Sequence, residues 1–173
     1  MTVLGVDPGL RIAGYGLIEP APGQRGGTRS PVRVVEAGCL RFNPKWTVSQ
    51  RLTELDSDFS ELLNRLRPDL VAVEMLFAHY KHPLTAVIMA HARGVILLAI
   101  NKRGIPLLEL RPTEIKKSLT GNGHASKEQM QDAVTLALGL PSRPEPPDVA
   151  DAIAIAMCAA MRQTDLVLPR RNP

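Results

Sequence analysis

The stretch TVLGVDPG, residues Thr2–Gly9, predicts a first β-strand that ends on an acid. Val3, Leu4 and Val6 are apolar and favour a strand, and Asp7 follows them directly. The Pro-Gly pair after the acid turns the chain. A carboxylate at the tip of a buried strand is poorly placed unless something there requires negative charge. Taken alone, Asp7 needs no role beyond starting the turn, so its interpretation depends on the acids elsewhere in the chain.

The overall composition predicts one soluble domain. The 173 residues suffice for a substantial core, and a hydrophobic share of 45% with a charged share of 22% is typical of globular proteins. We expect a single domain over residues 1–165 and a flexible basic tail over 166–173. Cys39 and Cys158 match no metal-site or redox spacing, which favours a reducing, cytoplasmic setting. We find no run of 18 apolar residues and no signal peptide before the first strand, so we expect no membrane contact.

Three strands with short connections predict an antiparallel meander in the first part of the chain. The second strand covers Arg11–Glu19 and the third covers Val32–Phe42, on either side of the polar loop Pro20–Pro31. Gly14 and Gly16 lie inside the second strand. Because glycine weakens a strand, these two mark either a bulge or tight packing point, or the close approach of another backbone or a ligand.

The pattern then alternates between helix and strand. Apolar residues recur at helical spacing over Thr47–Leu66, which predicts an amphipathic helix on the sheet. The apolar stretch Leu70–Met75 predicts a buried strand, parallel to a neighbour because a helix precedes it. Pro83–Lys102 is apolar on nearly every face, so we expect a helix that lies between the sheet and a second subunit. Ile105–Leu110 predicts the fifth strand.

Three helices complete the predicted fold. They are expected over Pro112–Leu119, from a Ser126–Gln129 capping box to Leu138, and over Asp148–Met161. The resulting order is β-β-β-α-β-α-β-α-α-α, with no internal repeat and no domain boundary. We therefore expect an α/β fold with a five-stranded mixed sheet flanked by helices.

Three further acids stand where their surroundings disfavour them. Glu74 interrupts the apolar fourth strand, where an ionised carboxylate is costly unless it reaches solvent, pairs with an arginine or binds a cation. Asp148 and Asp151 share one face at the start of the last helix. Asp148 can cap this helix, with Asp151 where the helix dipole favours a carboxylate. The helix must also pack on the sheet, which directs both acids toward strand tips such as Asp7. A capping role and a role in a functional site are therefore compatible.

The type of these side chains points to a metal and a polyanion. Oxygen ligands without nearby His or Cys favour a hard cation such as Mg²⁺ or Mn²⁺. Four acids can hold two such ions about 4 Å apart, an arrangement that promotes in-line displacement at a phosphodiester without a covalent enzyme intermediate. Without these four, 13 of the 17 acidic residues remain against 21 basic ones, a balance of +8 where the whole chain has +4. That balance favours a nucleic-acid partner.

Two segments offer candidate contacts to nucleic acid. Lys116, Lys117, His124 and Lys127 form a positive stretch suited to phosphates, although a solvated helix face with a surface loop explains the composition equally well. After the fourth strand, the segment Phe77–Lys81 combines two of the six aromatic residues with basic ones. Aromatic side chains beside positive charge stack on unpaired bases. The alternative for the phenylalanine is a plain core position.

In the order of these motifs the chain resembles the RuvC family, the bacterial Holliday junction resolvases with an RNase H-like fold. The motifs that carry the resemblance are Gly5–Gly9 (GVDPG), Gly14–Gly16 (GYG), Val73–Phe77 (VEMLF), Ala92–Gly94 (ARG), Lys116, Gly121, Gly123, Lys127, and Asp148, Asp151 and Ala152 (DxxDA). Other RNase H-like proteins share the Asp-Pro-Gly piece, whereas the ordered set in a chain of this length is highly specific.

The resemblance implies the roles of the site residues. The metal-binding catalytic acids would be Asp7, Glu74, Asp148 and Asp151, with the basic residues Lys116 and Lys127 beside them. Asp7 would bridge two Mg²⁺ ions per subunit, for which Mn²⁺ substitutes, and a lysine would stabilise charge on the phosphate. Some family members carry His at the position of Asp148, which makes Asp151 the firmer ligand.

The resemblance also implies how the enzyme works on DNA. A homodimer would nick two strands of like polarity symmetrically across a four-way junction, in homologous recombination and DNA repair, and the RuvA and RuvB branch-migration proteins would deliver the junction. Phe77 would stack at the open centre of the junction. The further DNA-binding candidates are Tyr80, Lys81, Lys117 and His124. The loop Pro20–Pro31 departs from the family in being longer and more basic, and it has no assigned role.

Three other functions compete with this one. A nuclease for RNA or an RNA–DNA hybrid would need no dimer and would leave Phe77 idle. A junction-binding module without catalysis would have no use for all four acids. An ATPase of the actin-like group also begins with a strand, an acid and a glycine, but it needs a two-lobed chain much longer than 173 residues.

Overall fold

The structure, a computed structural model, describes residues 1–21, 32–76 and 83–167. Five strands form one sheet in the order β3-β2-β1-β4-β5. The strands are β1 (Val3–Asp7), β2 (Ile12–Pro20), β3 (Val32–Arg41), β4 (Leu70–Glu74) and β5 (Leu107–Leu110). The helices are α1 (Val48–Leu66), α2 (Pro83–Lys102), α3 (Pro112–Thr120), α4 (Lys127–Leu138) and α5 (Pro147–Val167).

The pairing of the strands confirms the predicted mixed sheet. The first three strands form an antiparallel meander, with β2 between β1 and β3. The fourth strand lies parallel to β1, and β5 lies parallel to β4. The helices α1 and α2 each join parallel strands, as crossover connections require. The carboxyl ends of β1, β4 and β5 therefore meet at one edge of the sheet.

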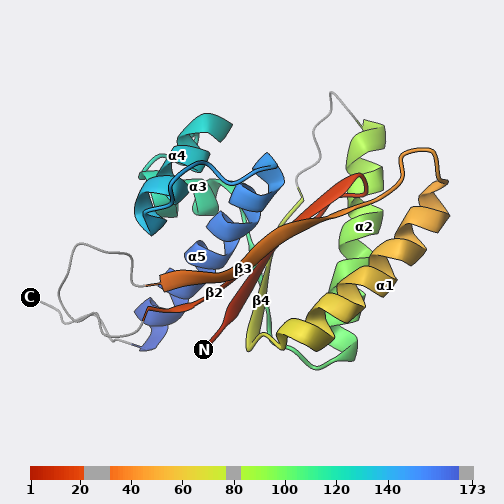
Figure 1. The fold of residues 1–173 in the computed structure, drawn as a ribbon, viewed down its shortest axis with the longest axis horizontal. Helices are drawn as coiled ribbons and strands as arrows, with labels where there is room; N and C mark the ends of the chain where they lie inside the picture. The colour runs from red at the N-terminus through yellow and green to blue at the C-terminus, as the bar shows by residue number, and fades with distance from the viewer. Residues whose placement is uncertain (22–31, 77–82, 168–173) are drawn as a thin grey trace, which may run out of the picture.

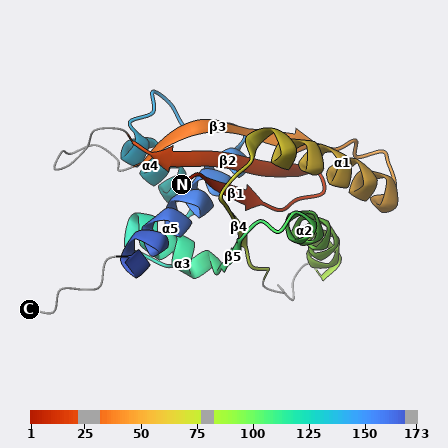
Figure 2. The same cartoon turned by 90° about the horizontal axis from the view of Figure 1, so that it is seen from below.

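Helices cover both faces of the sheet and bury two separate hydrophobic clusters (Figures 1 and 2). On one face, α1 and α2 pack against a cluster that includes Leu4, Val6 and Val73. On the other face, α5 packs with α3 and α4 against a cluster that includes Val3 and Ala72. Because side chains alternate along a strand, each inner strand supplies residues to both clusters, which explains its almost continuous apolar sequence.

Glycines in β1 and β2 let α5 lie directly against the sheet. A Cβ on Gly5 would lie 2.1 Å from the Ala152 carbonyl oxygen, and one on Gly14 would lie 2.0 Å from the Asp148 carbonyl oxygen. A Cβ on Gly16 would lie 2.8 Å from Ile153. Of the two interpretations of Gly14 and Gly16, the close approach of another backbone is therefore the one that the fold uses.

The start of the last helix differs from the expectation. Helix α5 begins at Pro147, so Asp148 lies within its first turn and is not the cap residue. Proline is favoured at the first helical position because its missing N–H would be unpaired there anyway. At its other end α5 continues to Val167, beyond the predicted Met161. The single domain and its tail stay a prediction, since residues 168–173 lie outside the described part.

Helix α2 is unusual for its hydrophobicity. Over Leu84–Lys102 it is long and apolar enough to cross a membrane by length and composition alone, with a mean hydropathy of 1.7. The same composition is found in core helices of soluble proteins. One side of α2, which includes Ala92, Ile96 and Ala99, is fully buried in the cluster shared with α1 and the sheet. Only 22% of the span is fully buried, however, and Leu84, Val87 and Leu98 are exposed apolar residues on its outer side.

The glycine contacts yield a stability prediction. We expect Gly5→Ala to destabilise the protein by about 1–3 kcal/mol, because the added methyl meets backbone atoms of α5 that cannot move independently. Urea denaturation measures the change. Gly123→Ala is the matched control, because Gly123 lies in the loop between α3 and α4 and an added Cβ would come no nearer than 3.3 Å to another residue, at the Thr113 carbonyl oxygen. We expect that control to stay within about 0.5 kcal/mol of the wild type. Equal stability of the two variants would show that α5 does not rest on the glycine.

Candidate active site

Two acids end neighbouring parallel strands and point to the same face of the sheet. Asp7 is the last residue of β1 and Glu74 is the last residue of β4. The two strands pair in register up to Val6 and Val73. Since side chains alternate, Asp7 lies on the face of Gly5, and Glu74 lies on the face of Ala72. Both of these residues pack on the side of α5, so both carboxylates are directed toward that helix.

Helix α5 brings the other two acids to the same place. Gly14 pairs with Asp7 across β1 and β2, and the backbone of Asp148 lies directly on Gly14. The first turn of α5 therefore sits over the end of β1. Asp148 and Asp151 follow one another on one side of the helix at this point. The fold thus brings together acids from three distant segments of the chain, as the sequence predicts.

A cavity of about 680 Å³ opens where these segments meet. All six residues predicted to be catalytic line it, namely Asp7, Glu74, Lys116, Lys127, Asp148 and Asp151. Apolar residues close its other side, including Ile88 and Met89 of α2 and Ile115 of α3. The cavity therefore combines convergent polar groups with an apolar wall, which is typical of an active site.

The carboxylates in the cavity disfavour one another's charge. Burial raises the pKa of Asp7 well above its ordinary value, and repulsion from Asp151, Glu74 and Asp148 raises it further. Burial and the charge of Asp151 raise the pKa of Glu74 to about 7. Burial also raises the pKa of Asp151, although the nearby Lys127 opposes this shift. Half-buried acids with raised pKa values that surround a cavity are candidates for function.

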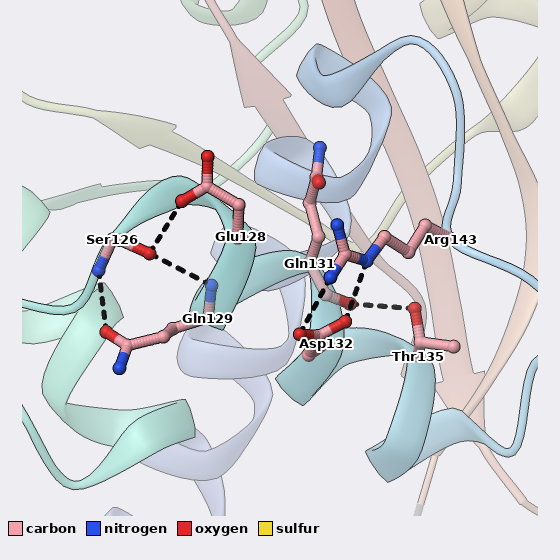
Figure 3. A network of polar contacts seen from close by, with 7 residues as sticks. All are labelled: Ser126, Glu128, Gln129, Gln131, Asp132, Thr135 and Arg143. Carbon is pink, nitrogen blue, oxygen red and sulfur yellow. Dashed lines mark hydrogen bonds and ion pairs between the residues drawn. The ribbon is translucent and has the colours of Figure 1, made fainter.

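Lys127 forms an ion pair with one of these acids, with its Nζ 3.7 Å from Oδ2 of Asp151. It is the first residue of α4, directly after the helix cap. Figure 3 shows this cap, in which the Gln129 N–H donates to Ser126 Oγ (3.2 Å) and the Ser126 N–H donates to Gln129 Oε1 (2.9 Å). The predicted capping box is therefore confirmed, and it fixes the helix end from which Lys127 extends.

A second contact in Figure 3 ties the far side of α4 to the connector before α5. Arg143 donates from Nε and Nη2 to the two carboxylate oxygens of Asp132, at 2.7 and 2.8 Å. This bidentate pair is exposed, so it adds little to stability, but it orients the connector geometrically. Polar contacts thus define the start of α4 and join this helix to the connector before α5.

The remaining predicted DNA contacts lie outside the cavity or outside the described residues. Lys117 and His124 are exposed and do not line the cavity. Phe77, Tyr80 and Lys81 fall in residues 77–82, which the structure does not describe. Their roles stay predictions.

Two cavity residues were missed by the sequence reasoning. Arg11 and Arg51 line the cavity beside the acids. Arg51 donates from Nη1 to the Leu10 carbonyl oxygen at 3.1 Å, so it holds the turn that follows Asp7. Arg11 stands four residues after the acid, and this proximity was a usable signal. Arg51 lies in an amphipathic helix among other polar residues, and nothing in the sequence distinguishes it from them.

The donor set fits a hard divalent cation. Within the described residues, no three His, Cys, Asp or Glu side chains lie close enough together to hold an ion by themselves. Mg²⁺ does not need such a cage, because it keeps several waters and binds through one or two carboxylates plus phosphate oxygens. Clustered half-buried carboxylates with raised pKa values are an arrangement that such a cation would stabilise. Asp7, Glu74 and Asp151 are therefore suitable ligands.

The chain is similar to proteins of known family along nearly its whole length. The family model for crossover junction endodeoxyribonuclease RuvC matches residues 3–159. A crossover junction endodeoxyribonuclease RuvC from Rhodopirellula baltica is 46% identical over 90% of this chain and 84% of the relative. One from Moorella thermoacetica is 42% identical over 92% of this chain and 91% of the relative.

The structural comparison agrees with the sequence comparison. The RuvC structure from Thermus thermophilus is similar with a TM-score of 0.81 and 32% identity, covering 95% of this chain and 96% of that one. The T. thermophilus RuvC in complex with a Holliday junction substrate is similar with a TM-score of 0.80 and 31% identity, covering 94% of each chain. These similarities confirm the expected fold class and the suspected family. The protein belongs to the RuvC family of crossover junction endodeoxyribonucleases.

Proposed function

We propose that this protein is a metal-dependent endonuclease that resolves Holliday junctions by paired, symmetric nicks in strands of like polarity, during homologous recombination and DNA repair. The observation that carries the proposal is the convergence of Asp7, Glu74, Asp148 and Asp151 on one cavity. Membership of the family and similarity to a RuvC in complex with a Holliday junction substrate support the choice of substrate.

The acids would hold the metal. Asp7, Glu74, Asp148 and Asp151, which line the cavity together, would hold two Mg²⁺ ions, for which Mn²⁺ would substitute. When bound, the ions supply an activated water and neutralise charge on the phosphate. This chemistry would allow in-line hydrolysis of the phosphodiester without a covalent link to the protein.

The two lysines contribute positive charge without binding metal. Lys127 extends from the capped start of α4 to within 3.7 Å of Asp151, and Lys116 lines the same cavity. A scissile phosphate that enters the cavity gains negative charge as the water attacks. We assign Lys127 and Lys116 the stabilisation of that charge, because both are held on helices next to the acids.

Contacts to the rest of the junction involve the surface around the cavity. The balance of +8 outside the four acids favours the DNA backbone, and Lys117 and His124 are exposed beside the site. Phe77, Tyr80 and Lys81 complete the proposed DNA-binding set, with Phe77 stacking at the junction centre. We further propose a cytoplasmic enzyme with one nuclease domain over residues 1–165, working with the RuvA and RuvB proteins.

The outward side of α2 supports a homodimer. Leu84, Val87, His91, Gly94 and Leu98 recur at spacings of three and four residues, and all five are exposed. This spacing places them in one stripe along the helix. The three aliphatic members are more than half exposed, which is unfavourable for a lone subunit. Packing of the stripe against a second copy would bury them and would place two active sites in one enzyme, as symmetric cleavage of two strands requires.

Loss of one acid should separate binding from cleavage. We expect Asp7→Asn and Glu74→Gln to bind a synthetic four-way junction but to cleave it more than about 100-fold more slowly than the wild type, because a metal ligand is lost. The wild type should cleave only with Mg²⁺ or Mn²⁺ and should spare linear duplex. Glu61→Gln makes the same chemical change on the exposed side of α1 and is the matched control. Undiminished cleavage by Asp7→Asn would contradict the metal site, and equal cleavage of linear duplex would contradict junction selectivity.

The raised pKa of Glu74 predicts a pH-dependent cost to stability. Its pKa is about 7 in the folded protein and near 4.5 in the unfolded chain. Between these values the folded state binds more protons, so stability falls as pH rises and the loss is complete above pH 7. In the absence of divalent ions, we expect Glu74→Gln to be about 2 kcal/mol more stable than the wild type at pH 8, and to lose this advantage near pH 4.5.

Urea denaturation at the two pH values measures this difference, with Glu61→Gln as the control for amide substitution at an exposed glutamate. A gain of the same size at both pH values would mean that packing, and not charge, distinguishes the variant.

The exposed stripe of α2 predicts the oligomeric state. We expect Leu98→Glu to raise the dissociation constant of the dimer at least about 100-fold, because it places two carboxylates in an apolar interface. Light scattering after gel filtration should then give 18.8 kDa, the mass of one chain. Leu136→Glu on α4, where the leucine is 84% exposed, is the control and should stay dimeric. A dimeric Leu98→Glu variant would place the interface elsewhere.

A further inference from the structure

Arg93 contacts the catalytic strand from the opposite side of the sheet. It lies on α2 within the Ala92–Gly94 motif, to which the proposed mechanism gives no role. Its side chain is 17% exposed. The guanidinium donates from Nε to the Glu74 carbonyl oxygen at 3.1 Å, and its Nη2 forms an ion pair with Oε2 of Glu109. One arginine thus connects α2 to the ends of β4 and β5.

The register of the sheet explains this geometry. Val73 pairs with Glu109 across β4 and β5, so the Glu109 side chain points to the α2 face while the Glu74 side chain points to the cavity. The ladder between β1 and β4 runs only to Val6 and Val73, so it gives the Glu74 carbonyl no pairing on that side. The Arg93 Nε–H supplies a donor at this strand end. Burial lowers the pKa of Arg93, and the carboxylate of Glu109 pairs with its guanidinium.

We propose that Arg93 is a positioning residue for the metal site, which fixes the backbone of Glu74 so that the carboxylate on the other face is held in the cavity. This inference rests on the proposed function, in which Glu74 is a metal ligand. A hydrogen bond from a charged donor is stronger and more directional than a neutral one. Without it, Glu74 keeps its pairing with Leu110 of β5, where the adjacent Met75 N–H donates to the Leu110 carbonyl, but its own carbonyl loses a charged donor.

The alternative is that Arg93 merely holds α2 against the sheet. Arg103, just after α2, provides a control for that role. It donates from Nη1 to the Ala99 carbonyl oxygen (3.0 Å) and from Nη2 to the Ser60 carbonyl oxygen of α1 (3.2 Å). Like Arg93, it connects this helix to another element through backbone carbonyls. Arg93 bonds to the cavity residue Glu74, whereas Arg103 bonds to Asn64, Ala99 and Ser60, none of which lines the cavity.

The test compares Arg93→Ala with Arg103→Ala in the full-length protein. Mn²⁺ binding is followed by electron paramagnetic resonance without DNA, and single-turnover cleavage of a saturating junction is followed against Mg²⁺ concentration. We expect Arg93→Ala to weaken Mn²⁺ binding about 10-fold and to raise the half-saturating Mg²⁺ concentration about 10-fold, the size typical for residues that orient a metal ligand. Junction affinity without divalent ions should not change. Arg103→Ala should lose stability and keep wild-type metal dependence.

Two conservative variants keep the test informative if Arg93→Ala does not fold. Arg93→Lys retains a charged donor and should recover part of the Mn²⁺ affinity. Glu109→Gln leaves the bond to Glu74 in place and should bind Mn²⁺ with an affinity between those of the wild type and Arg93→Ala. The inference is overturned if the folded Arg93 variants bind Mn²⁺ as the wild type does and lose only stability. If Glu74→Gln also leaves Mn²⁺ binding unchanged, the proposed metal site itself fails, which is a separate outcome.

Discussion

Repulsion among carboxylates that are withdrawn from water is the constraint on which the rest of this structure depends. Asp7, Glu74 and Asp151 all have raised pKa values, and in each case burial is the largest cause. Without a bound cation, this arrangement of carboxylates does not stabilise the folded chain. The fold must therefore hold the acids together with contacts that lie outside the cavity, and those contacts make the site ready for a cation and a phosphate.

Different parts of the fold meet this constraint in different ways. Gly5 and Gly14 remove side chains from the sheet, so α5 rests on the backbone and its acids reach the strand ends. Arg51 holds the turn after Asp7, and Arg93 holds the carbonyl of Glu74. Both arginines come from the helices on the opposite face. Arg51 lines the cavity while it holds this turn, whereas Arg93 acts from outside the cavity, and Lys127 forms an ion pair with Asp151 inside it.

The sequence predicted the elements more fully than the contacts between them. The apolar run before Asp7 was sufficient to place this acid at a strand end, because a buried strand has few other places for a charge. Glu74 was predicted within a strand that runs to Met75, whereas β4 ends at Glu74 itself. The same pattern did not reveal Arg93, since its two partners become neighbours only through the register of β4 and β5. The start of α5 was placed one residue late, because Asp148 resembles a cap when the preference of Pro147 for the first helical position is overlooked.

Helix α2 has three different sides: one is buried, one carries the exposed stripe and one carries Arg93. Because these sides are separate, the proposed dimer and the proposed role of Arg93 can be tested independently. Ala92 and Ile96 are buried against α1 and the sheet. The stripe that ends at Leu98 faces outward, while Arg93 lies on a third side and reaches the strand ends. At 100° per residue, Arg93 and Leu98 point in clearly different directions. A substitution at Leu98 therefore changes the association of subunits without removing the bond to Glu74. Loss of metal affinity in an Arg93 variant that remains dimeric must then arise within one subunit.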